Sequence, residues 1–228
     1  MPPLDSLASG SPPTLTLPAG TSGAAAITST GGALFHAGEL FSSEELQAMR
    51  LDGLVRRIYG GSYLRADYTE DAAVRAQCAS RSVPRGLRSR VALGRQCAAW
   101  IYGCAPPPHL LSLVTDHRRR TTSLPLFSAA VLHQASLGPF DINLIAGIPV
   151  TTPLRTALDI AIHGEDGSAV EILREIASSG TLDCRLRLVE AALTTTRRVP
   201  GRTKALARLR QAQAPPTEGQ EPPDARPA

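Results

Sequence analysis

The pattern of apolar and polar positions divides the chain into an unpatterned start, a patterned middle and an unpatterned end. Residues 1–33 consist mainly of Pro, Gly, Ser, Thr and Ala, carry Asp5 as their one charged residue and show no periodicity. Residues 214–228 are rich in Pro and acidic residues. Such segments bury too little apolar surface to offset the entropy of ordering them. The sequence therefore predicts that both ends are disordered.

The first patterned segment predicts a short helix followed by a basic hairpin. Ser42 with Glu45 three residues later forms a capping box, so a helix is expected over Ser42 to Asp52. Two glycines, Gly60 and Gly61, separate two β-favouring runs and predict a tight turn. A helix followed by a basic hairpin is typical of the second half of a winged helix. Residues 34–68 are thus expected to form a winged-helix-like module, truncated because the Gly- and Thr-rich segment Ala24 to Leu40 is a poor helix former.

The pattern over residues 69–213 predicts a second, larger domain. Helices are expected at Asp71–Ser80, Ser89–Cys104, Ser168–Ser178, Asp183–Thr195 and Val199–Ala212, and strands at Leu110–Thr115, Ala129–Leu132, Asp141–Ile145 and Ile148–Val150. Another helix should begin at Pro153 with Thr152 as its N-cap. Because helices and strands do not alternate as βαβ units, the fold class is α+β, with a small antiparallel sheet packed against several helices.

The charge distribution adds a candidate partner. The formal net charge is +4, and subtracting the ends leaves +7 on residues 34–213, nearly all of it from arginine. Guanidinium groups bind phosphate oxygens bidentately, so this surplus suits nucleic acid. The alternative is that arginine simply replaces lysine, as is common in proteins from high-GC genomes.

Two groups of arginines are the candidate DNA contacts. The first group lies on the predicted helix and hairpin and consists of Arg50, Arg56, Arg57 and Arg65. The second follows a predicted strand and consists of Arg118, Arg119 and Arg120. Both would contact phosphates and give salt-dependent affinity. The competing interpretation is a solvated basic hairpin and a charged turn beside a sheet.

Arg155 and Asp159 stand four residues apart and are expected to pair on one side of a helix. We interpret them as a structural pair that ties the helix to the sheet, with a toxin-facing or operator-facing role as the alternative.

The sequence does not favour an enzyme. The five histidines occur in unrelated contexts, and no metalloprotease, phosphate-loop or nucleophile-elbow motif is present. The four cysteines do not have metal-ligand spacing. We therefore expect no catalytic residues, no metal and no cofactor. The chain contains no signal-peptide pattern and no apolar run of about 20 residues, so no membrane association and a cytoplasmic location are expected.

Four segments resemble the AbiEi-like antitoxins of actinobacteria and occur in the same order. They are FSSEELQAMRLDGLVRRIYGGSYLRADY, VALGRQCAAWIYGCAPPP, LLSLVTDHRRR and GIPVTTPLRTALDIA. The last is the most specific, because it has both threonines, the proline and the spacing from Arg155 and Thr156 to Asp159.

The resemblance implies a DNA-binding module joined to an α+β domain. Members of this family are antitoxins of type IV toxin–antitoxin systems that repress their own operon. Their partner is a nucleotidyltransferase-like toxin, which need not bind the antitoxin directly. The sequence thus predicts a non-catalytic regulator that binds its own promoter. The alternative is a protein-interaction module, or an orphan relative that has lost DNA binding.

Overall fold

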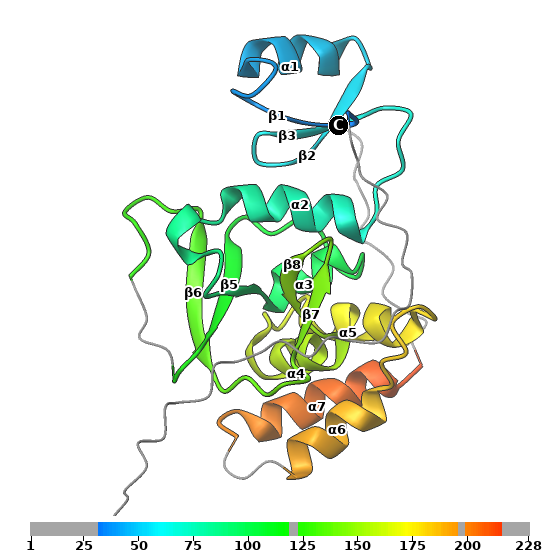
Figure 1. Ribbon diagram of the computed structural model, residues 1–228. Helices are drawn as coiled ribbons and strands as arrows, with labels where there is room; N and C mark the ends of the chain where they lie inside the picture. The colour runs from blue at the N-terminus through cyan, green and yellow to red at the C-terminus, as the bar shows by residue number, and fades with distance from the viewer. Residues whose placement is uncertain (1–31, 119–122, 196–198, 216–228) are drawn as a thin grey trace, which may run out of the picture.

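The computed structural model describes residues 32–118, 123–195 and 199–215 (Figure 1). Most of the two ends predicted to be disordered, together with Arg119 and Arg120, lies outside these ranges. The chain is α+β, as the sequence predicts, with one three-stranded and one five-stranded sheet among the described residues.

The first sheet belongs to the amino-terminal module. Its elements are β1 (Leu34–His36), α1 (Ser43–Leu51), β2 (Val55–Tyr59) and β3 (Ser62–Arg65). The strand order is β1-β3-β2, and both pairs are antiparallel. The predicted capping box begins α1, and the turn at Gly60, with a φ of 54°, joins β2 to β3. Strand β1 was not predicted from the sequence.

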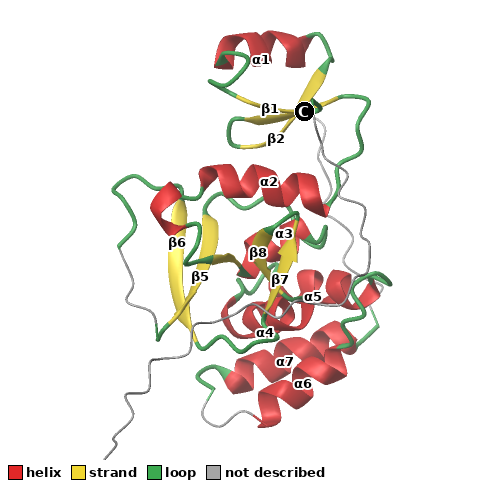
Figure 2. Ribbon diagram, viewed as in Figure 1, coloured by secondary structure: helices red, strands yellow, loops and turns green. Residues whose placement is uncertain are grey.

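A helix covers each face of this sheet (Figure 2). Leu46 of α1 packs with Val55 and Tyr63 on one face. On the other face, Leu64 packs in the same apolar cluster as Val74 of α2 (Ala72–Ser82). The sheet is therefore held between α1 and α2.

The second sheet has the order β6-β5-β4-β8-β7. Its strands are β4 (Ala92–Leu93), β5 (Leu111–Asp116), β6 (Ala130–Ala135), β7 (Ile142–Ile145) and β8 (Ile148–Thr151). The prediction of an antiparallel sheet is wrong in this respect, because β5 pairs with β6 and β4 pairs with β8 in parallel. The pairs β4–β5 and β7–β8 are antiparallel, and a short turn at Ala146 and Gly147 joins the two strands of the second pair.

The helix predicted over Ser89–Cys104 is wrong in its first half. After a single 3-10 turn, η1 (Arg85–Leu87), the chain enters the central strand β4, and α3 spans only Arg95–Ile101. Between strand and helix, Gly94 passes so close to β5 that a Cβ there would lie 2.4 Å from Val114 Cγ2. A buried run of three apolar residues, Val91 to Leu93, suits a central strand as well as a helix.

Four helices complete the fold, namely α4 (Pro153–His163), α5 (Ala169–Ser178), α6 (Leu186–Thr195) and α7 (Arg202–Gln213). Thr152 caps α4 by accepting a hydrogen bond from the Arg155 backbone N–H, as predicted. Residues of all four helices share one apolar cluster, which Ala99 of α3 joins. No helix among the described residues has the length and apolarity needed to span a membrane.

Candidate nucleic-acid interface

The arginines predicted to contact DNA divide into local groups. Arg56 lies at the base of the hairpin, where its guanidinium donates to Glu70 Oε2 at 2.7 Å and to the Tyr68 carbonyl at 3.0 Å. Arg65 pairs with Asp67 and lies over the Tyr68 ring, 5.0 Å from its centroid. These two guanidinium groups are therefore already engaged by neighbouring carboxylates.

Arg50 lies in the last turn of α1 and is exposed, and its Nε donates to Gln47 Oε1 at 3.0 Å. Residues 34–68 as a whole carry four arginines against five acidic residues, which gives the module a net charge of −1. The +7 surplus of the folded region therefore arises entirely from residues 69–213.

Arg57 lies at the tip of the hairpin, where its Nε donates to the Gly60 carbonyl at 2.7 Å. The tip itself lies against the end of α2, because a Cβ at Gly60 would be 3.3 Å from Ser82 Oγ. Arg57 is opposite Tyr63 in the sheet, so its side chain starts on the face that α1 covers, and only the hairpin tip reaches the carboxyl end of α2.

That end of α2 and the turn after it carry four further arginines without an acidic residue among them, in the segment RSVPRGLRSR. We call Arg81, Arg85, Arg88 and Arg90 the arginine strip.

The members of the arginine strip differ in how they are held. Arg81 pairs with Glu39. Arg88 donates from Nε to the Val83 carbonyl at 3.2 Å, which suits a cation near a helix carboxyl end. Arg85 and Arg90 are exposed, and within the described residues their guanidinium groups have no hydrogen-bond or ion-pair partner.

Sequence reasoning missed residues 81–90 as a site. The sequence does show four arginines within ten residues. Such a run indicates a candidate phosphate contact only once the hairpin tip is known to lie beside it.

Arg118 lies on the exposed turn after β5, and its backbone N–H donates to Asp116 Oδ1 at 3.0 Å. The Thr115 hydroxyl donates to the Arg90 carbonyl at 3.0 Å, so the end of β5 lies beside the arginine strip. Arg118 comes three residues after Thr115, whereas Arg119 and Arg120 lie outside the described residues.

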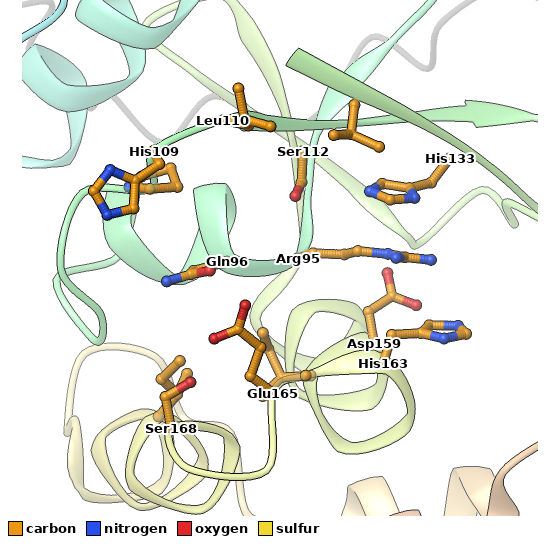
Figure 3. A pocket seen from close by; sticks show the side chains of 15 residues that line it. Arg95, Gln96, His109, Leu110, Ser112, His133, Asp159, His163, Glu165 and Ser168 are labelled. Carbon is orange, nitrogen blue, oxygen red and sulfur yellow. The ribbon is translucent and has the colours of Figure 1, made fainter. Parts of the chain in front are cut away.

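Among the described residues, no group of three or more His, Cys, Asp or Glu side chains is arranged so that it could hold a metal ion. All four cysteines are free and buried, and burial raises the pKa of the Cys78 thiol to about 12. His133 and His163 line a cavity together with Asp159 (Figure 3).

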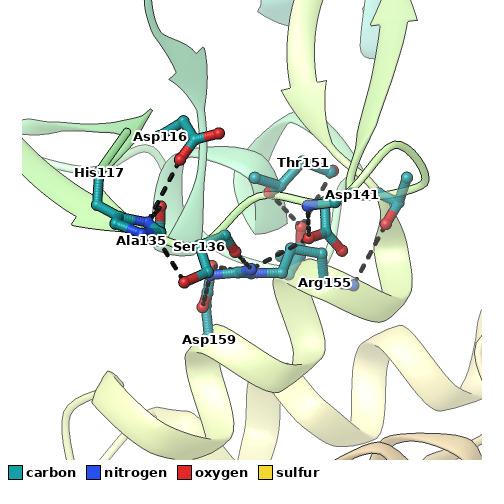
Figure 4. Close-up of polar contacts among 11 residues, drawn as sticks. Asp116, His117, Ala135, Ser136, Asp141, Thr151, Arg155 and Asp159 are labelled. Atoms are coloured by element: carbon teal, nitrogen blue, oxygen red, sulfur yellow. Dashed lines mark hydrogen bonds and ion pairs between the residues drawn. The ribbon is translucent and has the colours of Figure 1, made fainter. Parts of the chain in front are cut away.

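Arg155 and Asp159 form the expected pair (Figure 4), with Arg155 Nε and a terminal nitrogen each 3.0 Å from a carboxylate oxygen of Asp159. Arg155 also donates to the Ser136 carbonyl at 2.7 Å and contacts Asp141 Oδ2 at 3.3 Å. Both residues of the pair are nearly buried, at 11% and 5% side-chain exposure. The group ties α4 to the segment between β6 and β7.

Comparison with known proteins adds little to this description. No family model matches the chain, and no curated protein matches it. Among solved structures, the chain is similar to the crystal structure of RV2827C protein from Mycobacterium tuberculosis, with 15% identity and a TM-score of 0.40 over 75% of this chain. The chain spans 65% of the length of that structure. A likeness this low carries no argument about fold or function.

Proposed function

We propose that this protein is a non-catalytic DNA-binding regulator of the AbiEi antitoxin type, and that the arginine strip contacts the phosphates of its own promoter. The observation that carries the proposal is the run of four arginines at the end of α2 and in the turn after it, next to the hairpin tip. Glu39 is the one acidic residue paired with them in the described part of the chain.

The arginine strip suits phosphate more than a solvated surface because Arg85 and Arg90 have no protein partner among the described residues. Each guanidinium that neutralises a phosphate releases condensed counterions, which makes affinity fall steeply with salt. Helix α1 lies on the outer face of the first sheet with Gln47 and Arg50 exposed. These side chains would supply base contacts from the face of the sheet opposite α2.

The antitoxin part of the proposal rests on the resemblance of residues 147–161 to that family. A functional link to a nucleotidyltransferase-like toxin follows from the same resemblance. Inspection of the adjacent gene tests it: a nucleotidyltransferase-like neighbour supports the link, and an unrelated neighbour argues for an orphan relative.

Fluorescence anisotropy with a labelled fragment from upstream of the gene tests DNA binding. Replacing Arg85 and Arg90 together with alanine should weaken binding to all fragments and lower the slope of log affinity against log salt by about two. The matched control is the double replacement of Arg185 and Arg187, which lie in or next to α6 and are exposed. Absence of binding at low salt, or equal loss in the control, contradicts the proposal.

A second candidate function, a protein-interaction module, is favoured by a different observation. The amino-terminal module has a net charge of −1 and exposes Leu40, Leu51 and Leu54 at 75%, 78% and 55% around α1. Leu51 ends α1, Leu40 precedes it and Leu54 follows it, and exposed apolar side chains grouped in one region often mark a protein contact. A stable partner that co-purifies after nuclease treatment, and is lost on replacing Leu51 with Ser, would favour this function over DNA binding.

A further inference from the structure

A cavity of about 370 Å³ lies between the second sheet and helices α3, α4 and α5 (Figure 3). Its walls come from segments far apart in the sequence, including the start of α3, strands β5 and β6, and the turn between α4 and α5. A volume of this size is within the range of small-molecule sites. The cavity is separate from the arginine strip, since none of the strip residues lines it.

Arg95 is the cation that faces this cavity. It is the first residue of α3 and has a φ of +52°, in the left-handed region that non-glycine residues rarely adopt. The preceding residue, Gly94, packs tightly against Val114 of β5, and this contact fixes the Arg95 backbone. Strained residues of this kind persist where the surrounding structure imposes them, and they are concentrated at functional sites.

Within the described part of the chain the Arg95 guanidinium makes no hydrogen bond and no ion pair, and its charge interacts with that of Asp159 over a longer distance. Figure 3 shows it extended between His133 and Asp159. The Asp159 carboxylate is already held at both oxygens by Arg155. A half-buried cation beside an engaged carboxylate leaves its donors available for an incoming anion.

His133 lies on one side of the Arg95 side chain, and His163 lies on the other side beyond Asp159 (Figure 3). Burial and the charge of Arg95 lower the pKa of His133 to about 4. The same two causes lower the pKa of His163. Both rings are therefore neutral at neutral pH, and each offers one N–H donor and one acceptor nitrogen. Neutral rings next to Arg95 supply hydrogen bonds without adding charge.

The opposite end of the cavity has acceptor character. Figure 3 places Glu165 and Ser168 there, away from His133. Within the described residues the Glu165 carboxylate has no side-chain partner. It is suited to accept hydrogen bonds from hydroxyl groups. The cavity is thus polar at both ends, with a donor end at Arg95 and an acceptor end at Glu165.

We propose that this cavity binds a small hydroxylated molecule that carries a phosphate or carboxylate group. The oxyanion pairs with Arg95 on the side of His133, away from the Asp159 carboxylate, and the hydroxyl groups reach Glu165 and Ser168. Binding would give the chain a small-molecule site in addition to its DNA contacts. The ligand would also contact Arg95, the cavity-lining cation whose backbone has a strained, positive φ.

Isothermal titration of the full chain without DNA tests the proposal, so its failure would leave the DNA-binding proposal standing. The probes are ribose 5-phosphate, gluconate and inorganic phosphate, with ribose as the uncharged control. Ribose 5-phosphate or gluconate should bind, and which of the two binds more tightly distinguishes a phosphate from a carboxylate ligand. Arg95→Gln should weaken binding at least about tenfold, because it removes charge-assisted hydrogen bonds.

One further variant tests the acceptor end of the cavity, and a second serves as a control. Glu165→Gln, at an exposed position, should weaken binding of ribose 5-phosphate while leaving inorganic phosphate unchanged. Arg187→Gln on α6 is the matched control and should bind all probes as the parent does. The proposal is overturned if neither anion binds at millimolar concentration, if ribose binds as tightly as ribose 5-phosphate, or if folded Arg95→Gln binds as the parent does.

Discussion

Replacing Asp159 with alanine removes one partner of a nearly buried ion pair and leaves the Arg155 guanidinium in place. The Arg155 side chain is 11% exposed and that of Asp159 is 5% exposed, so the substitution leaves a nearly buried cation without its main partner. Breaking a buried pair in this way costs about 3–5 kcal/mol. The Ser136 carbonyl at 2.7 Å and Asp141 at 3.3 Å still contact Arg155, which places the expected loss near about 3 kcal/mol, the lower end of that range.

Urea denaturation followed by circular dichroism measures this loss as a change in the free energy of unfolding. The control is Lys204→Ala, which breaks the pair of Lys204 with Asp166, whose side chains are 55% and 74% exposed. Exposed pairs contribute below about 1 kcal/mol, so this variant should unfold almost as the parent does. A loss below about 1 kcal/mol for Asp159→Ala would refute the structural role and favour a partner-facing role for the pair.

Three further predictions concern Gly94, Arg95 and His133. Gly94→Ala should destabilise the fold by about 1–3 kcal/mol, because its Cβ would lie 2.4 Å from Val114 Cγ2; an unchanged melting temperature would contradict this. Arg95→Gly should raise the free energy of unfolding by about 1 kcal/mol by relieving the positive φ, and lower stability in urea denaturation would show that Arg95 contributes more than strain. The folded-state pKa of His133, about 4, lies below the ordinary histidine value of 6.5, so the unfolded chain binds more protons between these values and stability should fall as pH drops from 6.5 to 4. His133→Gln should make that fall shallower, and an identical pH profile would argue against the effect.

Elements with local signals were predictable from the sequence. The capping box at Ser42 and Glu45, the glycine turn at Gly60 and the Thr152–Pro153 helix start each depend on residues within a few positions of one another. Their hydrogen bonds form in almost any tertiary context.

Elements whose state depends on distant partners were not predictable. Strand β1 has only three residues and exists through its pairing with β3, which is 26 or more residues away in sequence. The apolar run that contains Ala92 and Leu93 is a strand because β5 and β8 flank it. Periodicity alone cannot distinguish such a short buried strand from a helix segment.

The candidate sites follow the same rule. The pairing of Arg155 with Asp159 could be predicted because both lie on one helix turn. The engagement of Arg56 by Glu70 required knowledge of how the chain turns after β3. The cavity could not be predicted, since Arg95, His133 and Glu165 come from three separate segments.

The position of α2 between the first sheet and the rest of the chain has a mechanical consequence. One apolar cluster contains Leu64 of the first sheet, Val74 of α2 and Leu93 of the second sheet, so the cluster continues through the helix from one sheet to the other. Tyr59 extends this contact to Trp100 of α3, with ring centroids 5.1 Å apart. Pulling the amino-terminal module away would expose these side chains to water, so the connection behaves as a rigid joint and not as a hinge. The hairpin tip and the turn after α2 consequently move together, and their relative orientation is preorganised in the free protein.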